Sequence, residues 1–218
     1  MNKAQVTMDK GEELASDLAY VRSLAEEGAT APLVGGFYYV LWGGLMGLAA
    51  LIVYVFALDL LPVGRLGFLL PWMIAGAAGW IFSFAWGRGA AVKPGAMTLG
   101  NKTARSVWFA VGVFMTLLWL TFMIVHDNYA ALGVPRYFLF SLMFPIAFGV
   151  YGVAFFATAT AAKLEWLRWY AYLAWAFCVL CLFLLDSAHQ FLAGGIGCFV
   201  TAALPGALLM QREPRNIV

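Results

Sequence analysis

The sequence predicts an all-α integral membrane protein with six transmembrane helices, arranged as three helical hairpins and preceded by a short amphipathic helix. Hydrophobic residues make up 64% of the chain and charged residues 11%, against about 25% charged residues in soluble domains. The run from Pro32 to Leu58 holds about 27 residues without a charged side chain, whereas roughly 20 apolar residues suffice to cross a bilayer as a helix. Five further apolar runs follow, separated by polar turns.

Residues 1–31 are the one polar segment long enough for a helix outside the bilayer, at the cytoplasmic or interfacial level. Asp9 and Glu12 have the spacing of a capping box, and Gly28 is a typical residue for a helix C-terminus. Apolar residues recur between them at steps of three and four, which predicts one apolar stripe. We expect residues 10–28 to rest on the membrane surface or to dock a soluble protein partner. The acidic face of this helix disfavours simple adhesion to anionic lipid.

The remaining chain divides into six spans and a tail. The predicted spans cover residues 32–58, 66–86, 107–125, 137–162, 169–185 and 191–210, and residues 211–218 form a polar cytoplasmic tail. The longest connection is the predicted loop 87–106, which carries four cations and no acid. With the N-terminus in the cytoplasm, every lysine and arginine except Arg65 and Arg136 lies on the cytoplasmic side. Because basic loops stay in the cytoplasm, we predict that both termini are cytoplasmic, in a bacterial inner (plasma) membrane.

The even-numbered spans share a pair of glycines three positions apart. These six predicted helix-packing residues are Gly76, Gly79, Gly149, Gly152, Gly194 and Gly197. Small residues let helices approach closely in a bilayer, where lipid offers no hydrophobic drive for association. The odd-numbered spans are rich in aromatic residues instead. We therefore expect the even spans at the centre of the bundle and the odd spans outside, and homo-oligomer formation stays open.

The predicted spans contain no charged residue and no histidine, asparagine or glutamine. They therefore lack a lysine for a retinal Schiff base, and a carboxylate or histidine for a proton relay or a haem. Cys178 and Cys181 have CxxC spacing in the fifth span and Cys198 lies in the sixth, but their apolar neighbours favour packing over redox chemistry. We predict no cofactor and no catalytic residue. The net charge of +2 gives no reason to expect a nucleic-acid partner.

Acids and histidines instead lie where the odd spans end on the outer side. These residues are Asp59, His126, Asp127, Asp186 and His189. A carboxylate at a helix C-terminus faces the negative end of the helix dipole, at a cost of about 0.3–1 kcal/mol. If the hairpins surround one axis, the five side chains converge on a site for a divalent metal or a cationic ligand. The alternative is that they are solvated turn residues, since no metal-ligand spacing such as His-x-x-x-His is present.

Together these patterns favour a non-enzymatic membrane module that regulates, anchors or assists partner proteins. The first alternative is a small transporter or channel subunit for an uncharged or weakly polar solute, with the even spans as its moving parts. The second alternative is a metal or cation site at the outer face. A six-helix architecture by itself does not decide among them.

Overall fold

The computed structural model describes residues 15–20, 32–61, 63–90, 93, 96–135 and 138–213. Within these ranges the protein is all-helical, and six helices are long and apolar enough to cross a membrane. The predicted fold class is confirmed at this level. Residues 15–20 are helical, which agrees with the predicted amphipathic helix, whereas its predicted caps Asp9 and Gly28 lie outside the described residues.

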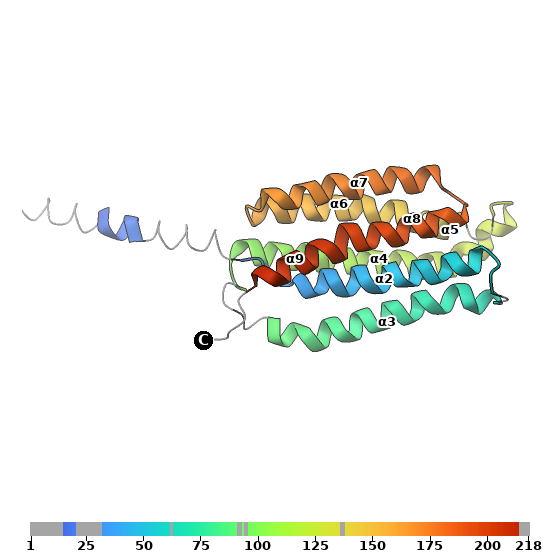
Figure 1. Cartoon of the computed structure of the whole chain (residues 1–218), viewed down its shortest axis with the longest axis horizontal. Helices are drawn as coiled ribbons and strands as arrows, with labels where there is room; N and C mark the ends of the chain where they lie inside the picture. The colour runs from blue at the N-terminus through green and yellow to red at the C-terminus, as the bar shows by residue number, and fades with distance from the viewer. Residues whose placement is uncertain are drawn as a thin grey trace, which may run out of the picture.

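The bundle contains nine helical elements within the described residues. These are α2 (Gly36–Ala57), α3 (Arg65–Ala90), α4 (Leu99–Ala131), α5 (Phe138–Ser141), α6 (Met143–Ala161), α7 (Glu165–Phe183), α8 (Ala188–Cys198), the π-helix η1 (Phe199–Ala203) and α9 (Leu204–Arg212). Helices α5 and α6 form the fourth spanning unit, and α8, η1 and α9 form the sixth, which we call the final span. In Figure 1 the helices lie side by side in an elongated bundle, with α3 and α7 at opposite edges.

Several helices extend beyond the predicted spans, among them α4, α7 and the final span. Helix α4 begins at Leu99 and has 33 residues, so part of the predicted basic loop is helical. At 1.5 Å per residue α4 is about 50 Å long, more than the roughly 30 Å of a hydrocarbon core. The final span begins at Ala188, which places His189 and Gln190 inside a spanning helix. These spanning helices are longer than the predicted spans and therefore contain histidine, glutamine and, in α4 and α7, charged residues.

Helix α2 packs against the final span with the two backbones in direct contact. A Cβ atom added at Gly36 would lie 2.6 Å from the carbonyl oxygen of Gly206, and one added at Gly43 would lie 2.6 Å from the amide nitrogen of Ala203. At Gly47 an added Cβ would meet the Phe199 ring at 2.8 Å. Gly36, Gly43 and Gly47 thus serve one interface, whereas an added Cβ at Gly44 would meet nothing within 4 Å. We call this interface the glycine seam.

The spans differ in how much of their apolar stretch is buried. The buried share is 50% in the final span, 33% in α5–α6 and 28% in α2, but 11% in each of α3 and α4. Helix α3 packs mainly against α2, and α4 packs mainly against α6. The expected central position of the even spans therefore holds for the fourth and sixth and is wrong for the second. The first span, an odd one, belongs to the core.

Most glycines of the even spans leave room for an aromatic ring. At Gly79 an added Cβ would lie 2.7 Å from the ring of Trp42, and at Gly152 it would lie 2.0 Å from the ring of Trp175. At Gly194 and Gly197 it would lie 2.5 Å from the rings of Phe144 and Phe148, respectively. At Gly149 the nearest atom is the Cys178 Sγ, at 3.7 Å, and at Gly76 nothing lies within 4 Å. Five of the six predicted packing glycines therefore contact a neighbouring side chain, and Gly76 does not.

Candidate functional site

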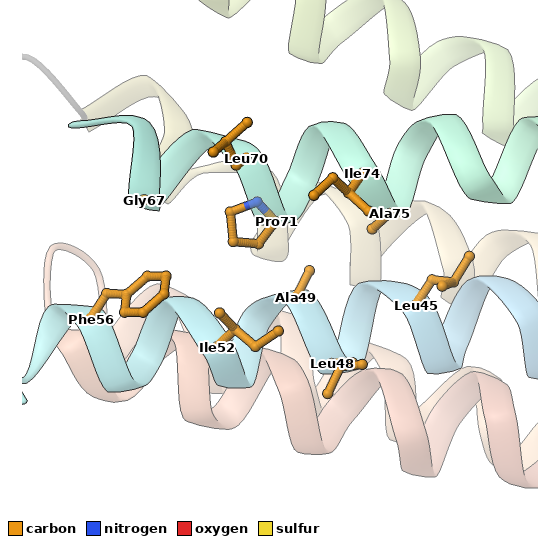
Figure 2. A pocket seen from close by; sticks show the side chains of 10 residues that line it. All are labelled: Leu45, Leu48, Ala49, Ile52, Phe56, Gly67, Leu70, Pro71, Ile74 and Ala75. Atoms are coloured by element: carbon orange, nitrogen blue, oxygen red, sulfur yellow. The ribbon is translucent and has the colours of Figure 1, made fainter. Parts of the chain in front are cut away.

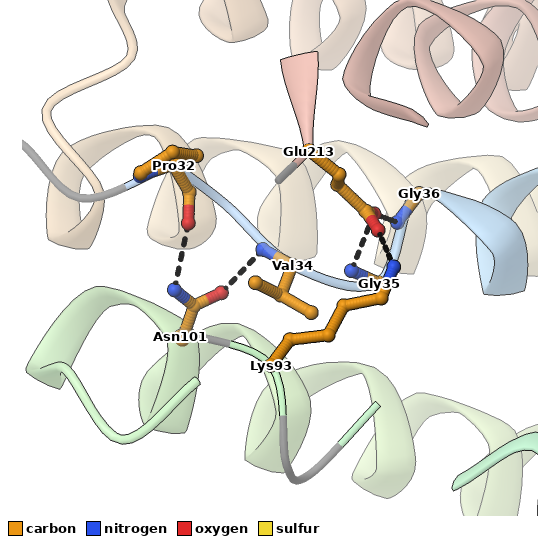
Figure 3. A network of polar contacts seen from close by, with 7 residues as sticks. All are labelled: Pro32, Val34, Gly35, Gly36, Lys93, Asn101 and Glu213. Atoms are coloured by element: carbon orange, nitrogen blue, oxygen red, sulfur yellow. Dashed lines mark hydrogen bonds and ion pairs between the residues drawn. The ribbon is translucent and has the colours of Figure 1, made fainter. Parts of the chain in front are cut away.

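The most polar site of the bundle lies where α2 begins and α9 ends, which we call the basic end. Residues 32–35, the strap, lead into α2 there (Figure 3). Helix α2 has no acidic residue in its first turn, and its N-cap, Gly35, has no side chain to accept a hydrogen bond. Its first backbone N–H groups therefore need an acceptor from elsewhere in the chain.

Glu213 supplies that acceptor from the other end of the chain. Its Oε1 accepts hydrogen bonds from the backbone N–H groups of Gly35 at 2.8 Å and Gly36 at 2.7 Å. Gly35 has a φ of 117°, a conformation that favours glycine. Consecutive N–H groups pointing at one oxygen form an anion-binding nest, and the positive end of the helix dipole adds to the attraction.

Lys93 neutralises the same carboxylate. Its ammonium group forms an ion pair with the Glu213 Oε2 (Figure 3). The side chain of Glu213 is only 7% exposed, and that of Lys93 is 26% exposed. Because a buried carboxylate is costly unless it is paired and hydrogen-bonded, the lysine and the two amides together explain how this acid is tolerated. The contact also joins the α3–α4 connection to the end of α9.

Asn101 holds the strap from the side of α4. Its Oδ1 accepts from the backbone N–H of Val34 at 2.6 Å, and its Nδ2 donates to the carbonyl oxygen of Pro32 at 3.0 Å (Figure 3). The residue is buried. One amide side chain thus satisfies a donor and an acceptor of an irregular segment. Together with Lys93 and Glu213, Asn101 forms the strap network.

The opposite end, which we call the far end, is fixed by a neutral amide. Gln190 is 1% exposed, and its Nε2 donates to the carbonyl oxygens of Ser141 at 2.7 Å and Cys181 at 2.9 Å. The carbonyl of Ser141 has lost its helical partner, because Pro145 has no N–H. The carbonyl of Cys181 lies in the last turn of α7, where carbonyls lack intrahelical donors. Gln190 therefore satisfies both carbonyls.

The predicted outer residues lie in separate contacts. Asp59 and Asp186 have positive φ values of 53° and 58°, in the turns that follow α2 and α7. Aspartate tolerates this left-handed conformation better than most residues, so backbone geometry accounts for both positions. His189 Nδ1 lies 3.3 Å from the Tyr54 hydroxyl.

His126 and Asp127 lie inside α4 rather than at its end, because α4 continues to Ala131. The His126 Nε2 is 3.5 Å from the Asp127 Oδ1, and the His126 Nδ1 is 2.9 Å from the Met123 carbonyl oxygen. Among the described residues, no three His, Cys, Asp or Glu side chains lie close enough together to hold a metal ion. The structure thus pairs two of the five predicted ligands and does not gather the set.

A groove of about 270 Å³ runs between α2 and α3. Its lining is apolar, and Figure 2 shows Pro71 of α3 opposite Ala49 and Ile52 of α2. The groove lies between α2 and α3, one of the two least buried spans, and carries no polar side chain in its lining. It offers a surface for an apolar chain and has no group for acid–base or metal chemistry.

Sequence reasoning missed Asn101, Gln190 and Glu213, the three residues that hold the strap and the far end. Each was placed in a loop, a turn or the tail, outside the predicted spans. A signal was present for Gln190, since the proline at position 145 leaves a carbonyl without a donor. For Asn101 and Glu213 the sequence alone gives no indication, because both act on a strap more than sixty residues away.

Comparisons with known proteins identify no similar protein, so the functional argument rests on the geometry of the structure. No protein-family model matches the chain, and neither a curated protein nor a solved structure is significantly similar to it.

Proposed function

We propose that the protein is a membrane-embedded docking module: the six-helix bundle anchors the N-terminal helix, which binds a soluble partner at the cytoplasmic face. The observation that carries the proposal is the exposure of the large apolar side chain of Leu18 on that helix. Leu18 is 64% exposed in a helical segment with the acidic residue Asp17, and Tyr20, on another face of the same segment, is 65% exposed. An exposed apolar side chain on one face of a helix is the kind of anchor that enters a groove of another protein.

The strap network supports this role because it fixes the point where the N-terminal segment joins the bundle. Pro32 and Val34 are hydrogen-bonded to Asn101, and Gly35 is hydrogen-bonded to Glu213. The strap is tied to α4 through Asn101 and to the end of α9 through Glu213, which Lys93 links to the α3–α4 connection.

The proposed orientation places the basic end in the cytoplasm. The strap and the end of α9 meet at this end through Glu213, and Lys93 joins them there. Arg212 ends α9 at the same place. The positive-inside rule then assigns both termini to the cytoplasm. Single cysteines at positions 18 and 60, labelled with a membrane-impermeant maleimide in intact cells, should react only at position 60.

Site-specific photo-crosslinking in cells tests the docking function. A photoreactive amino acid replaces Tyr20 in the full chain, and we expect a discrete protein adduct, identified by mass spectrometry. The adduct should disappear when Leu18→Asp is added, because a charge replaces an apolar anchor. The matched control places the same photoreactive residue at Phe183, a side chain that is 84% exposed at the end of α7. Adducts with lipid alone at position 20 would contradict docking and assign the helix to the membrane surface.

The transporter alternative has one structural feature in its favour. The fourth spanning unit is interrupted at Leu142, and the sixth contains η1 directly before α9, whose second residue is Pro205. Interrupted helices and π-helical turns recur where transporters bind substrates. Flux of a small polar solute, such as glycerol, through liposomes that contain residues 32–218 would favour this alternative. We expect flux equal to that of protein-free liposomes.

A further inference from the structure

A second cavity, of about 230 Å³, lies at the basic end beside the strap. It is lined by Pro32, Leu33, Leu164, Trp166, Leu209 and Arg212. The lining residues come from the strap, the α6–α7 turn, the first turn of α7 and the end of α9. Pro32, Leu33, Leu164 and Leu209 are apolar, and the two side chains that carry a polar group are Trp166, with its indole N–H, and Arg212, with its guanidinium. We call it the headgroup cavity.

Both polar groups are hydrogen-bond donors, and neither can accept. The Trp166 Nε1 is buried and has no hydrogen-bond partner within the described part of the chain. A buried donor without an acceptor is unfavourable, so an acceptor that reaches this nitrogen from the cavity would remove the penalty. The Arg212 guanidinium carbon lies 5.1 Å from the centre of the Trp166 ring, and this stacking keeps the two donors side by side.

The charges around the cavity leave Arg212 available for an anion. Arg168, two residues beyond Trp166, is already paired with Glu165, at an Nη1–Oε2 distance of 2.6 Å. The Glu213 carboxylate, next to Arg212 in the chain, is taken by Lys93 and the strap amides. Within the described residues, Arg212 forms no ion pair. It therefore contributes an uncompensated positive charge beside an unpaired donor.

The strap gives the cavity a fixed wall. Pro32 lines the cavity, and its carbonyl oxygen is held by Asn101. Leu33 and Leu209 also line it and are 3% and 2% exposed, so these walls belong to the packed core of the bundle. A ligand would therefore meet preformed walls, which lowers the entropy cost of binding.

We propose that the headgroup cavity binds the phosphate of an anionic phospholipid, with Arg212 and the Trp166 indole N–H as its donors. Arginine binds phosphate oxygens with paired, charge-assisted hydrogen bonds. The level in the membrane fits, because Trp166 lies in the first turn of α7 and Arg212 ends α9, where apolar helices meet the headgroups. The lipid chains would then lie along the apolar lining. This inference does not depend on the docking function.

Native mass spectrometry of the full chain in detergent tests the proposal, with phosphatidylglycerol and phosphatidylcholine titrated separately. We expect phosphatidylglycerol to bind several-fold more tightly. Arg212→Gln should weaken phosphatidylglycerol binding about tenfold, since a charge-assisted hydrogen bond is worth about 1.5–3 kcal/mol and 1.4 kcal/mol is tenfold. Trp166→Phe keeps the ring and removes the donor, and should weaken it about threefold to tenfold.

The matched control is Lys102→Gln, which removes one exposed positive charge near the start of α4, outside the cavity lining. It should change the affinity less than about twofold, as expected for an exposed charge. Equal losses in Lys102→Gln and Arg212→Gln would show diffuse attraction and overturn the site. Displacement of phosphatidylglycerol by millimolar inorganic phosphate would overturn the lipid assignment, because the site would then bind free phosphate from solution. Arg212→Lys keeps the charge without the paired donors and should give an intermediate loss.

Discussion

At the basic end the unpaired backbone groups are N–H donors, whereas at the far end they are carbonyl acceptors. The N–H groups of Gly35 and Gly36 find a carboxylate, from Glu213. The carbonyls of Ser141 and Cys181 find the amide of Gln190. At each end the buried polar side chain is therefore of the type that the nearby backbone lacks: an acceptor beside free N–H groups and a donor beside free carbonyl groups.

The two ends also differ in charge. The strap network contains an ion pair, and its lysine is 26% exposed, so water reaches one partner. Gln190 is 1% exposed and neutral. Charge is tolerated where water or a counter-charge is near, and a neutral donor serves where neither is available. We therefore expect substitutions at the far end to be more costly than those at the basic end.

Gln190→Met should have the largest effect. The side chain keeps its approximate size and loses its donor, which leaves two carbonyl groups unsatisfied. At about 1–3 kcal/mol for each of the two buried unsatisfied groups, we expect the free energy of unfolding to fall by about 2–6 kcal/mol. Denaturation of the full chain in mixed detergent micelles, followed by tryptophan fluorescence, measures it.

The matched control is Gln211→Met, the same change at an exposed position of α9. We expect this control to change the free energy of unfolding by less than about 0.5 kcal/mol, as is usual for surface positions. Equal effects in the two variants would show that the Gln190 hydrogen bonds contribute nothing. The far end would then depend on packing alone, and the comparison with the basic end would fail.

The glycine seam joins the two ends, because α2 begins at the basic end and the final span begins at the far end. Gly43→Ala would place a methyl group 2.6 Å from the Ala203 amide nitrogen, and a backbone atom cannot move aside as a flexible side chain can. We expect a loss of about 1–3 kcal/mol in the free energy of unfolding, typical of overpacking. Maleimide labelling of the buried Cys198 should also become faster.

Gly76→Ala is the control for that substitution. No atom lies within 4 Å of the added methyl group, and alanine favours a helix over glycine by up to about 1 kcal/mol. We expect unchanged or increased stability. A loss at Gly76 equal to that at Gly43 would show that any added methyl group perturbs these helices, and the seam would have no special role in holding the two ends together.

The six spanning helices were predictable because a charge-free run of about twenty residues has few other folds available. The polar sites were not, because they depend on partners that are distant in sequence. For Asp59 and Asp186 the sequence leaves two interpretations open, a cation site and solvated turn residues. Their backbone φ values of 53° and 58° favour the turn, and φ cannot be read from residue type. Gly35 and Glu213 are 178 positions apart, so nothing in either local pattern indicates their contact.

Glu213→Gln tests the basic end and should have the smallest effect of the three substitutions. The amide oxygen still accepts from Gly35 and Gly36, while the attraction to Lys93 and to the helix dipole is lost. We expect a decrease of about 1 kcal/mol in the free energy of unfolding, because the dipole term is about 0.3–1 kcal/mol and the lysine is partly solvated. Hydrogen exchange should accelerate at the strap amides and stay unchanged around Gln190.

Glu165→Gln is the matched control for Glu213→Gln, since it breaks an ion pair in which the carboxylate side chain is 71% exposed. It should change stability by less than about 0.5 kcal/mol and leave exchange at the strap unchanged. A Glu213→Gln effect larger than that of Gln190→Met would reverse the order expected for the two ends. The charge of the strap network would then stabilise the bundle more than the hydrogen bonds of a fully buried amide do, and water at Lys93 would weaken that ion pair less than its exposure implies.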